Sequence, residues 1–80
     1  MARYFLHLKD SIGQLLDPEG TELPPEAVPG AALRAARDCI AGDVQAGRLD
    51  LHYRIEVFND DGELVHTLPF ANALEVISPR

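Results

Sequence analysis

The chain has 80 residues, thirteen of them acidic against seven basic, which gives a net charge of −6. A chain of this length forms one small domain, residues 1–80, and buries only about 60% of the surface that its unfolded form exposes. Its single cysteine, Cys39, excludes an intramolecular disulfide, and its acidic charge disfavours binding to phosphate backbones.

Residues 3–9 predict the first β-strand, because apolar and other side chains alternate with a period of two. One face of this strand carries Tyr4, Leu6 and Leu8, and the other carries Arg3, Phe5, His7 and Lys9. The apolar face is expected to anchor the strand against a helix.

The segment after this strand is built around residues 17–20, Asp-Pro-Glu-Gly. Proline suits the second position of a turn and glycine the fourth. Two short extended arms of a hairpin, residues 14–16 and 21–23, are expected on either side.

Residues 29–47 predict the main helix, since they are rich in alanine, leucine and arginine. Pro29 suits the first helical turn and Gly47 suits a left-handed cap at the end. An earlier turn is expected at residues 25–26. The stripe expected to pack on the sheet recurs every three or four residues and comprises Leu33, Ala36, Ile40 and Val44.

Residues 49–70 predict a β-hairpin with its turn at the sequence NDDG. A two-residue turn at Asp61 and Gly62 places Val57 opposite His66, and Leu64, Leu68 and Phe70 then join the apolar face. A three-residue loop with Gly62 at a bulge instead places Glu56 opposite His66, and Val65 joins the apolar face. The first register collects more apolar side chains and is favoured. The segment from Phe70 onward is compatible with a turn, a helix or an edge strand.

The predicted fold class is therefore α+β: a small antiparallel sheet with one main helix packed on one face, in the order β-β-α-β-β. The chain resembles a family of small uncharacterised bacterial single-domain proteins through RYFLHLKD at its start, DPEGTELP, AALRAARD, and YRIEVFNDDGELVHTLPF near its end. The resemblance covers nearly the whole chain and implies a domain of unknown function without a catalytic assignment. The chain departs from the family pattern at PPEAVPG, where a more continuous helix start is expected.

Three groups of residues resemble sites of known chemistry, and none is expected to act as one. His7, Asp10 and Ser11 are close in sequence, but a strand turns neighbouring side chains to opposite faces. His52, Glu56 and His66 could be considered as metal ligands, although His52 and Glu56 lie about 13 Å apart along one strand. The sequence NDDGE has leucines and valine where a calcium loop needs oxygen ligands. We therefore expect no catalytic residues, no metal and no cofactor.

Basic residues of the helix could form a nucleic-acid site. Arg34 and Arg37 lie one helical turn apart, but Asp38 is placed to pair with Arg34. Nucleic acid is accordingly not expected as a direct ligand. No segment is long and apolar enough to suit a signal peptide or a membrane span, so a cytoplasmic location without membrane association is expected.

A second stripe on the helix consists of small residues, which would let another helix approach closely. Gly42 strengthens this interpretation, because a mid-helix glycine costs about 1 kcal/mol relative to alanine. The expected interface of a homodimer comprises this stripe and two aromatic residues of the sheet: Ala32, Ala35, Cys39, Gly42, Ala46, Phe5 and Phe58.

The function expected from the sequence is that of a small non-enzymatic interaction or regulatory module, acting as a homodimer or with another protein partner. The alternatives are a nucleic-acid-associated, antitoxin-like accessory protein and, less favoured, a small enzyme. No pocket-forming motif, nucleophile elbow or phosphate loop supports the enzyme.

Overall fold

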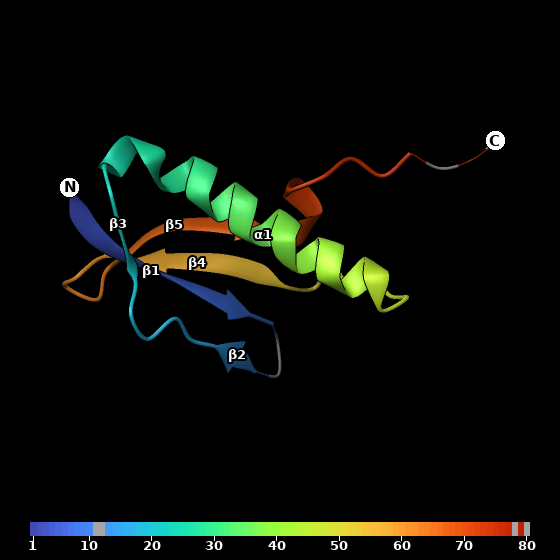
Figure 1. Ribbon diagram of the computed structural model, residues 1–80, viewed down its shortest axis with the longest axis horizontal. Coiled ribbons are helices and arrows are strands. Elements are labelled where there is room, and N and C mark those ends of the chain that lie inside the picture. Colours follow the sequence, from blue (N-terminus) through green and yellow to red (C-terminus); the bar gives the residue numbers. More distant parts are fainter. Residues whose placement is uncertain (11–12, 78, 80) are drawn as a thin grey trace.

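The computed structural model of the chain describes residues 1–10, 13–77 and 79. Five strands, one α-helix and two short 3-10 turns follow one another along it (Figure 1). They are β1 (Ala2–Lys9), β2 (Gln14–Leu15), β3 (Thr21–Leu23), η1 (Pro25–Ala27), α1 (Val28–Gln45), β4 (Arg54–Phe58), β5 (Leu64–Pro69) and η2 (Phe70–Asn72). The predicted α+β class is confirmed: one antiparallel sheet carries a single main helix on one face.

The strands lie in the order β2-β1-β4-β5, and β3 also pairs with β1. In the centre of the sheet Phe5 lies opposite Phe58 and Lys9 opposite Arg54. The expected faces of β1 are confirmed, because Tyr4 is buried in the core and Leu6 and Leu8 pack against it.

The two arms predicted as a hairpin both pair with β1 instead. Leu8 lies opposite Leu15, whereas Tyr4 lies opposite Thr21, so the three residues between Tyr4 and Leu8 face five residues of the returning chain. The two extra residues form an outward bulge. The hairpin prediction was therefore right about the extended arms and wrong about their pairing.

Asp17 holds this bulge against β1. Its Oδ2 accepts a hydrogen bond from the Leu6 N–H (3.4 Å) and its Oδ1 accepts one from the Gly20 N–H (3.1 Å). The Asp17 N–H in turn donates to Nδ1 of His7 (3.0 Å). Gly20 adopts a φ of +73°, which favours glycine. The turn residues thus hold the returning chain against β1 by hydrogen bonds, and they do not form the tip of a separate hairpin.

The helix begins one residue earlier than predicted, at Val28, with Pro29 in its first turn and η1 directly before it. Gly47 has a φ of +89° just after the helix, as expected of a left-handed cap. The core face is formed by Val28, Ala32, Ala36 and Ile40. Val44 was wrongly placed in this stripe: it is 56% exposed, since the helix ends one residue later.

The β4–β5 hairpin combines the two predicted registers. Val57 lies opposite His66 and Ile55 opposite Leu68, as in the favoured register. The loop, however, has three residues, with Gly62 at a φ of +79° and the Asn59 N–H donating to the Glu63 carbonyl. The pairing shifts between Val57 and Phe58, so that one extra residue on β5 restores the favoured register.

The hairpin also corrects one burial prediction. Leu68 packs against the core and Phe70 is fully buried, whereas Leu64 is 53% exposed next to the turn. Beyond η2, Ala73 is buried and the Arg37 Nε–H donates to its carbonyl (2.8 Å), which fixes this end of the chain to α1. Residues 74–77 then lead away from the body of the molecule (Figure 1).

No helix within the described residues is long and apolar enough to cross a membrane.

Candidate functional site

The helix covers only half of the sheet face on which it lies. α1 packs mainly against β4 and β5, and β1 and β2 lie on the far side of this contact (Figure 1). A helix is about 10 Å wide and neighbouring strands are about 4.8 Å apart, so one helix covers about two strands. The strip of sheet formed by β1 and β2 is consequently left open beside the helix.

This strip forms an apolar depression that we call the α1–β2 trough. Its middle section has a volume of about 190 Å³ and is lined by Leu6, Leu8, Leu15, Leu16, Ala35 and Cys39, among others. Neighbouring hollows share Leu6 and Ala35 at one end and Leu8 and Leu15 at the other, which makes the depression continuous along β1.

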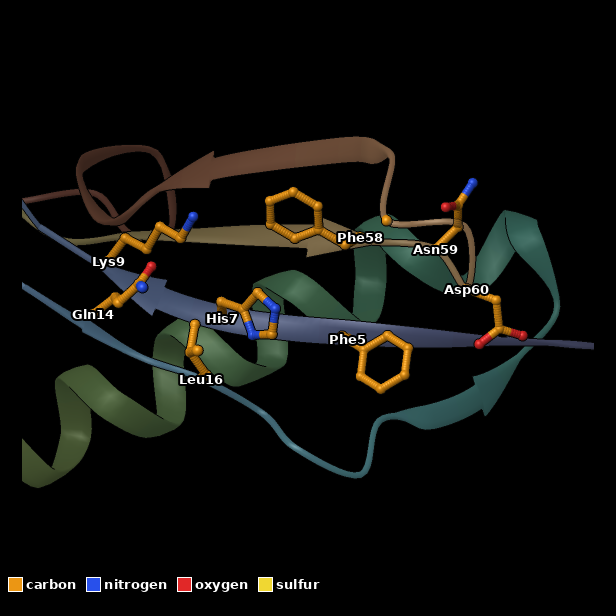
Figure 2. Close-up of a pocket in the computed structure, with 9 residues that line it drawn as sticks. Phe5, His7, Lys9, Gln14, Leu16, Phe58, Asn59 and Asp60 are labelled. Carbon is orange, nitrogen blue, oxygen red and sulfur yellow. The ribbon is translucent and has the colours of Figure 1, made fainter.

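Leu15 on the sheet side of the trough is unusually accessible, with 68% of its surface exposed. Leu16 is 51% exposed, but its side chain lies beside His7 on the opposite face of the sheet (Figure 2). Leu15 shares the helix-side face of the sheet with Leu8, its partner on β1. Exposed apolar side chains that line a continuous depression are typical of a binding surface.

The small-residue stripe predicted on the helix is divided between three environments. Ala32 is fully buried against the sheet within one chain. Ala35 and Cys39 are half-buried and line the trough. Gly42 and Ala46 are exposed, and a Cβ added at Gly42 would meet no atom within 4 Å. Only Ala35 and Cys39 therefore combine with other apolar residues into one surface.

The trough has a negative electrostatic environment. Asp17 lines its middle section, and Asp38 lies with Arg34 in the adjoining hollow. Burial raises the pKa of the Cys39 thiol, and the charges of Asp43 and Asp38 raise it further. The thiol consequently remains protonated near neutral pH and is a poor nucleophile.

The opposite face of the sheet carries the predicted aromatic pair. Phe5 and His7 of β1 and Phe58 of β4 line an open hollow of about 410 Å³ together with Lys9 and Leu16 (Figure 2). The His7 and Phe58 rings lie 5.2 Å apart, and Nζ of Lys9 lies 5.0 Å from the centre of the Phe58 ring. Both phenylalanines are half-buried.

Glu56 neutralises the cations on this open face. Its carboxylate accepts from Lys9 Nζ at 2.8 Å and from Arg54 Nε at 2.7 Å, and its side chain is only 13% exposed. These two hydrogen bonds hold the pKa of Glu56 below its usual range. Lys9 and Arg54 are therefore both engaged with Glu56 on this face.

The residues that resembled a catalytic triad are not assembled into one. His7 accepts its hydrogen bond from the Asp17 N–H, and Asp10 exchanges hydrogen bonds with the backbone of Gly13. Ser11 lies outside the described residues.

The three residues considered as metal ligands are also separated. Thr67 lies opposite Glu56 on the open face, while His66 lies opposite Val57 and shares its helix-side face. His52 bonds to Asp50 instead. In the part of the chain that the structure describes, no three His, Cys, Asp or Glu residues are grouped to hold a metal ion.

The NDDGE sequence uses its oxygens within the hairpin turn. Oδ1 of Asn59 accepts hydrogen bonds from the N–H groups of Asp61 (3.0 Å) and Glu63 (2.9 Å). The amide of Asn59 also donates to the Glu63 carboxylate. The cluster thus closes a turn, as the sequence indicated.

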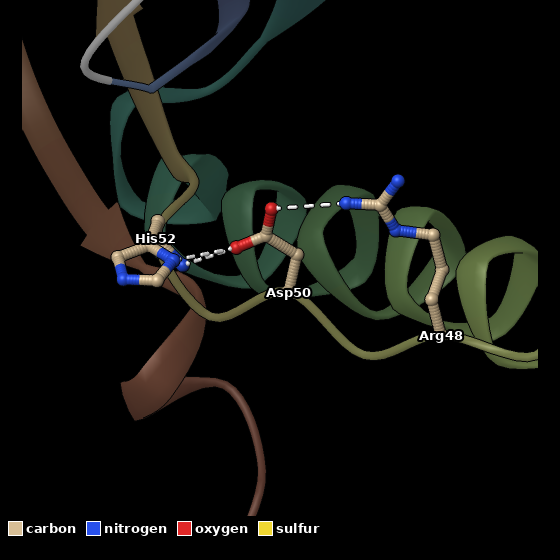
Figure 3. Close-up of polar contacts among 3 residues, drawn as sticks. All are labelled: Arg48, Asp50 and His52. Atoms are coloured by element: carbon tan, nitrogen blue, oxygen red, sulfur yellow. Dashed lines mark hydrogen bonds and ion pairs between the residues drawn. The ribbon is translucent and has the colours of Figure 1, made fainter.

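A polar cluster in the loop before β4 was not identified from the sequence. Asp50 accepts hydrogen bonds from the His52 N–H and ring, and forms an ion pair with Arg48 at 3.3 Å (Figure 3). The hydrogen bonds from His52 lower the pKa of Asp50, with a smaller contribution from the Arg48 charge. The His52 side chain is 90% exposed, so the cluster organises the loop at the surface rather than enclosing a reaction site.

The sequence reasoning also missed the trough itself. Its signal was Leu15, an apolar residue in an arm too short to bury its side chain. Recognising it required knowing that this arm pairs with β1 at the edge of the sheet, beyond the reach of the helix.

Comparisons with known proteins identify the family and nothing more specific. Neither the curated proteins nor the solved structures contain a match to the chain. The match to a family covers residues 3–71, from β1 to η2, and therefore all of the secondary structure on which the trough is built. The chain belongs to the family described as Domain of unknown function (DUF6894).

Proposed function

We propose that the protein is a small non-enzymatic interaction module that binds another polypeptide through the α1–β2 trough. The observation that carries this proposal is the half-covered sheet, which leaves Leu15 exposed beside Ala35 and Cys39. Binding of an apolar element there would remove these side chains from water, at about 25 cal/mol per Å² of apolar surface.

The alternatives receive less support from the same structure. A nucleic-acid-binding face would need accessible cations, and Lys9 and Arg54 are both bonded to Glu56. An enzyme would need a nucleophile or acid beside a base, and His7 is instead bonded to a backbone N–H.

Photo-cross-linking in the cells that naturally express the protein tests this proposal. A photoreactive phenylalanine analogue is placed at Leu15 in the trough and, as the matched control, at Leu64 on the opposite edge of the sheet. Both side chains are well exposed, at 68% and 53%. We expect a discrete cross-linked product from position 15 and little from position 64.

The mass of the product identifies the kind of partner. A species of twice 8.8 kDa is a second copy of this chain, and another mass is a different protein. Equal cross-linking from both positions, or none from position 15, would refute the trough as a binding surface.

A further inference from the structure

We infer that the partner in the α1–β2 trough is an amphipathic helix of a different protein, with a leucine-rich face and basic flanks. This inference rests on the proposed function, because it names the chemistry of the ligand for the same surface. It follows from the size of the trough, its charge and the composition of α1.

The dimensions of the trough suit a helix. The continuous depression extends along β1 from the level of Tyr4, opposite Thr21, to Asp10. Six residues of strand at about 3.3 Å each give a length of about 20 Å. A helix rises about 1.5 Å per residue, so this length corresponds to about 13 residues, or between three and four turns.

A helix is also the element that would complete the layer. α1 already lies over β4 and β5, and a second helix beside it would cover β1 and β2. Packed helices lie 8–10 Å apart depending on the side chains between them, and small residues permit the closer approach. Ala35 and Cys39 present such small side chains on the flank of α1 that lines the trough.

The acidic residues around the trough favour a partner helix with basic residues on its flanks. Asp17 lies on the sheet side of the trough and Asp38 on the helix side, and Asp43 is close enough to Cys39 to act on its thiol. Arg34 is the basic residue that lines the trough with them. The chain as a whole carries a charge of −6, which adds a longer-range attraction for a basic partner.

The helix of a second copy is a poor occupant by the same criteria. The exposed residues of α1 include Arg34, Arg37, Asp38, Ala41 and Gln45. They offer no row of leucines to fill the trough, and a two-fold arrangement through Asp38 would bring like charges together. The occupant that fits is therefore supplied by another protein.

The test uses the purified full chain and three synthetic peptides of 14 residues. The first is a leucine–lysine amphipathic helix, the second replaces every lysine with glutamate, and the third scrambles the leucine–lysine sequence so that the apolar face is lost. Binding is measured by fluorescence anisotropy. A second readout is the rate at which a neutral reagent alkylates Cys39, which reports on the trough because it is the only cysteine of the chain.

We expect the leucine–lysine helix to bind with a micromolar Kd and to slow alkylation of Cys39 at least fivefold at saturation. The glutamate and scrambled peptides should bind at least tenfold more weakly, and raising the salt concentration should weaken the leucine–lysine complex. Leu15→Ser should weaken binding about tenfold, whereas Leu64→Ser should change it less than twofold. Both positions are exposed, so neither variant perturbs the fold.

Equal binding of the lysine and glutamate helices would overturn the inferred charge preference. Binding that leaves Cys39 unprotected, or that Leu64→Ser weakens as much as Leu15→Ser, would place the peptide elsewhere and overturn the site. A dimer of the chain that protects Cys39 without peptide would show that the occupant is a second copy. These failures leave the cross-linking result at position 15 untouched, so they are distinguishable from failure of the proposed function.

Discussion

Substituting Gly20 with alanine tests the close contact between the bulge at residues 17–20 and β1. A Cβ at this position would lie 2.8 Å from the Tyr4 carbonyl oxygen and 2.9 Å from Cε1 of Phe5. The carbonyl belongs to a paired strand, so it cannot move aside without disturbing the pairing with β3. Gly20→Ala therefore combines a steric clash with a backbone conformation that alanine rarely adopts.

The two costs can be added from the structure. A left-handed φ costs a non-glycine residue about 1–2 kcal/mol, and overpacking typically costs about 1–3 kcal/mol. Alanine also reduces the entropy of the unfolded chain, which returns about 0.4–1 kcal/mol. The net destabilisation is therefore about 2–4 kcal/mol, which corresponds to a loss of roughly 10–25 °C in Tm for a domain of this size.

Two matched substitutions separate these terms in urea and thermal denaturation. Gly62→Ala has a similar φ of +79° but no atom within 4 Å of its new Cβ, so it should cost only about 1 kcal/mol. Gly42→Ala has open space in a helix and should stabilise the protein by about 1 kcal/mol. If Gly20→Ala proves no more destabilising than Gly62→Ala, the close approach between Gly20 and β1 is wrong.

Three further changes probe other contacts. The folded-state pKa of Glu56 is lowered, so its ion pairs stabilise the protein above the unfolded-state pKa and are lost as the pH falls through the lower folded-state value. Glu56→Gln should thus cost about 1 kcal/mol in urea denaturation at pH 7 and progressively less as the pH is lowered below the unfolded-state pKa, and a cost that does not fall with pH would contradict this assignment. Asp17→Ala should cost about 2 kcal/mol, because the Leu6 and Gly20 N–H groups lose their acceptor, whereas a surface control such as Asp61→Ala should change stability by less than 0.5 kcal/mol. Arg37→Leu should release the Ala73 carbonyl and speed hydrogen exchange near residue 73, and unchanged exchange there would show that packing of Ala73 alone fixes this end.

The sequence identified most elements because their local patterns agree with their environments. The alternation in residues 3–9 and the alanine-rich helix with Pro29 and Gly47 at its ends were sufficient to place β1 and α1. The hairpin was found with its favoured strand register but the wrong loop, since one extra residue at the bulge makes a three-residue loop compatible with that register. Local sequence patterns do not reveal that a longer loop and a bulge on β5 cancel each other in the strand register.

The candidate site was harder to predict, because its residues come from segments far apart in the sequence. Ala35 and Cys39 were singled out for their small size, and the structure places them beside Leu6, Leu8 and Leu15 of the sheet. Ala32 belongs to the same predicted stripe of small residues, but it is buried in the core. Whether a small residue on a helix faces the core, a depression or solvent depends on where the sheet lies beneath it.

The fold class, the main helix, and the first strand with its two faces could thus be read from the sequence alone, because they follow from hydrophobic periodicity and from where proline and glycine are tolerated. That residues 14–23 return along β1, and that one helix leaves half of this sheet face uncovered, became visible only in the folded chain. Those two outcomes depend on pairing between distant segments and on the widths of a helix and a sheet. Together they create the α1–β2 trough, which no single segment of the sequence contains.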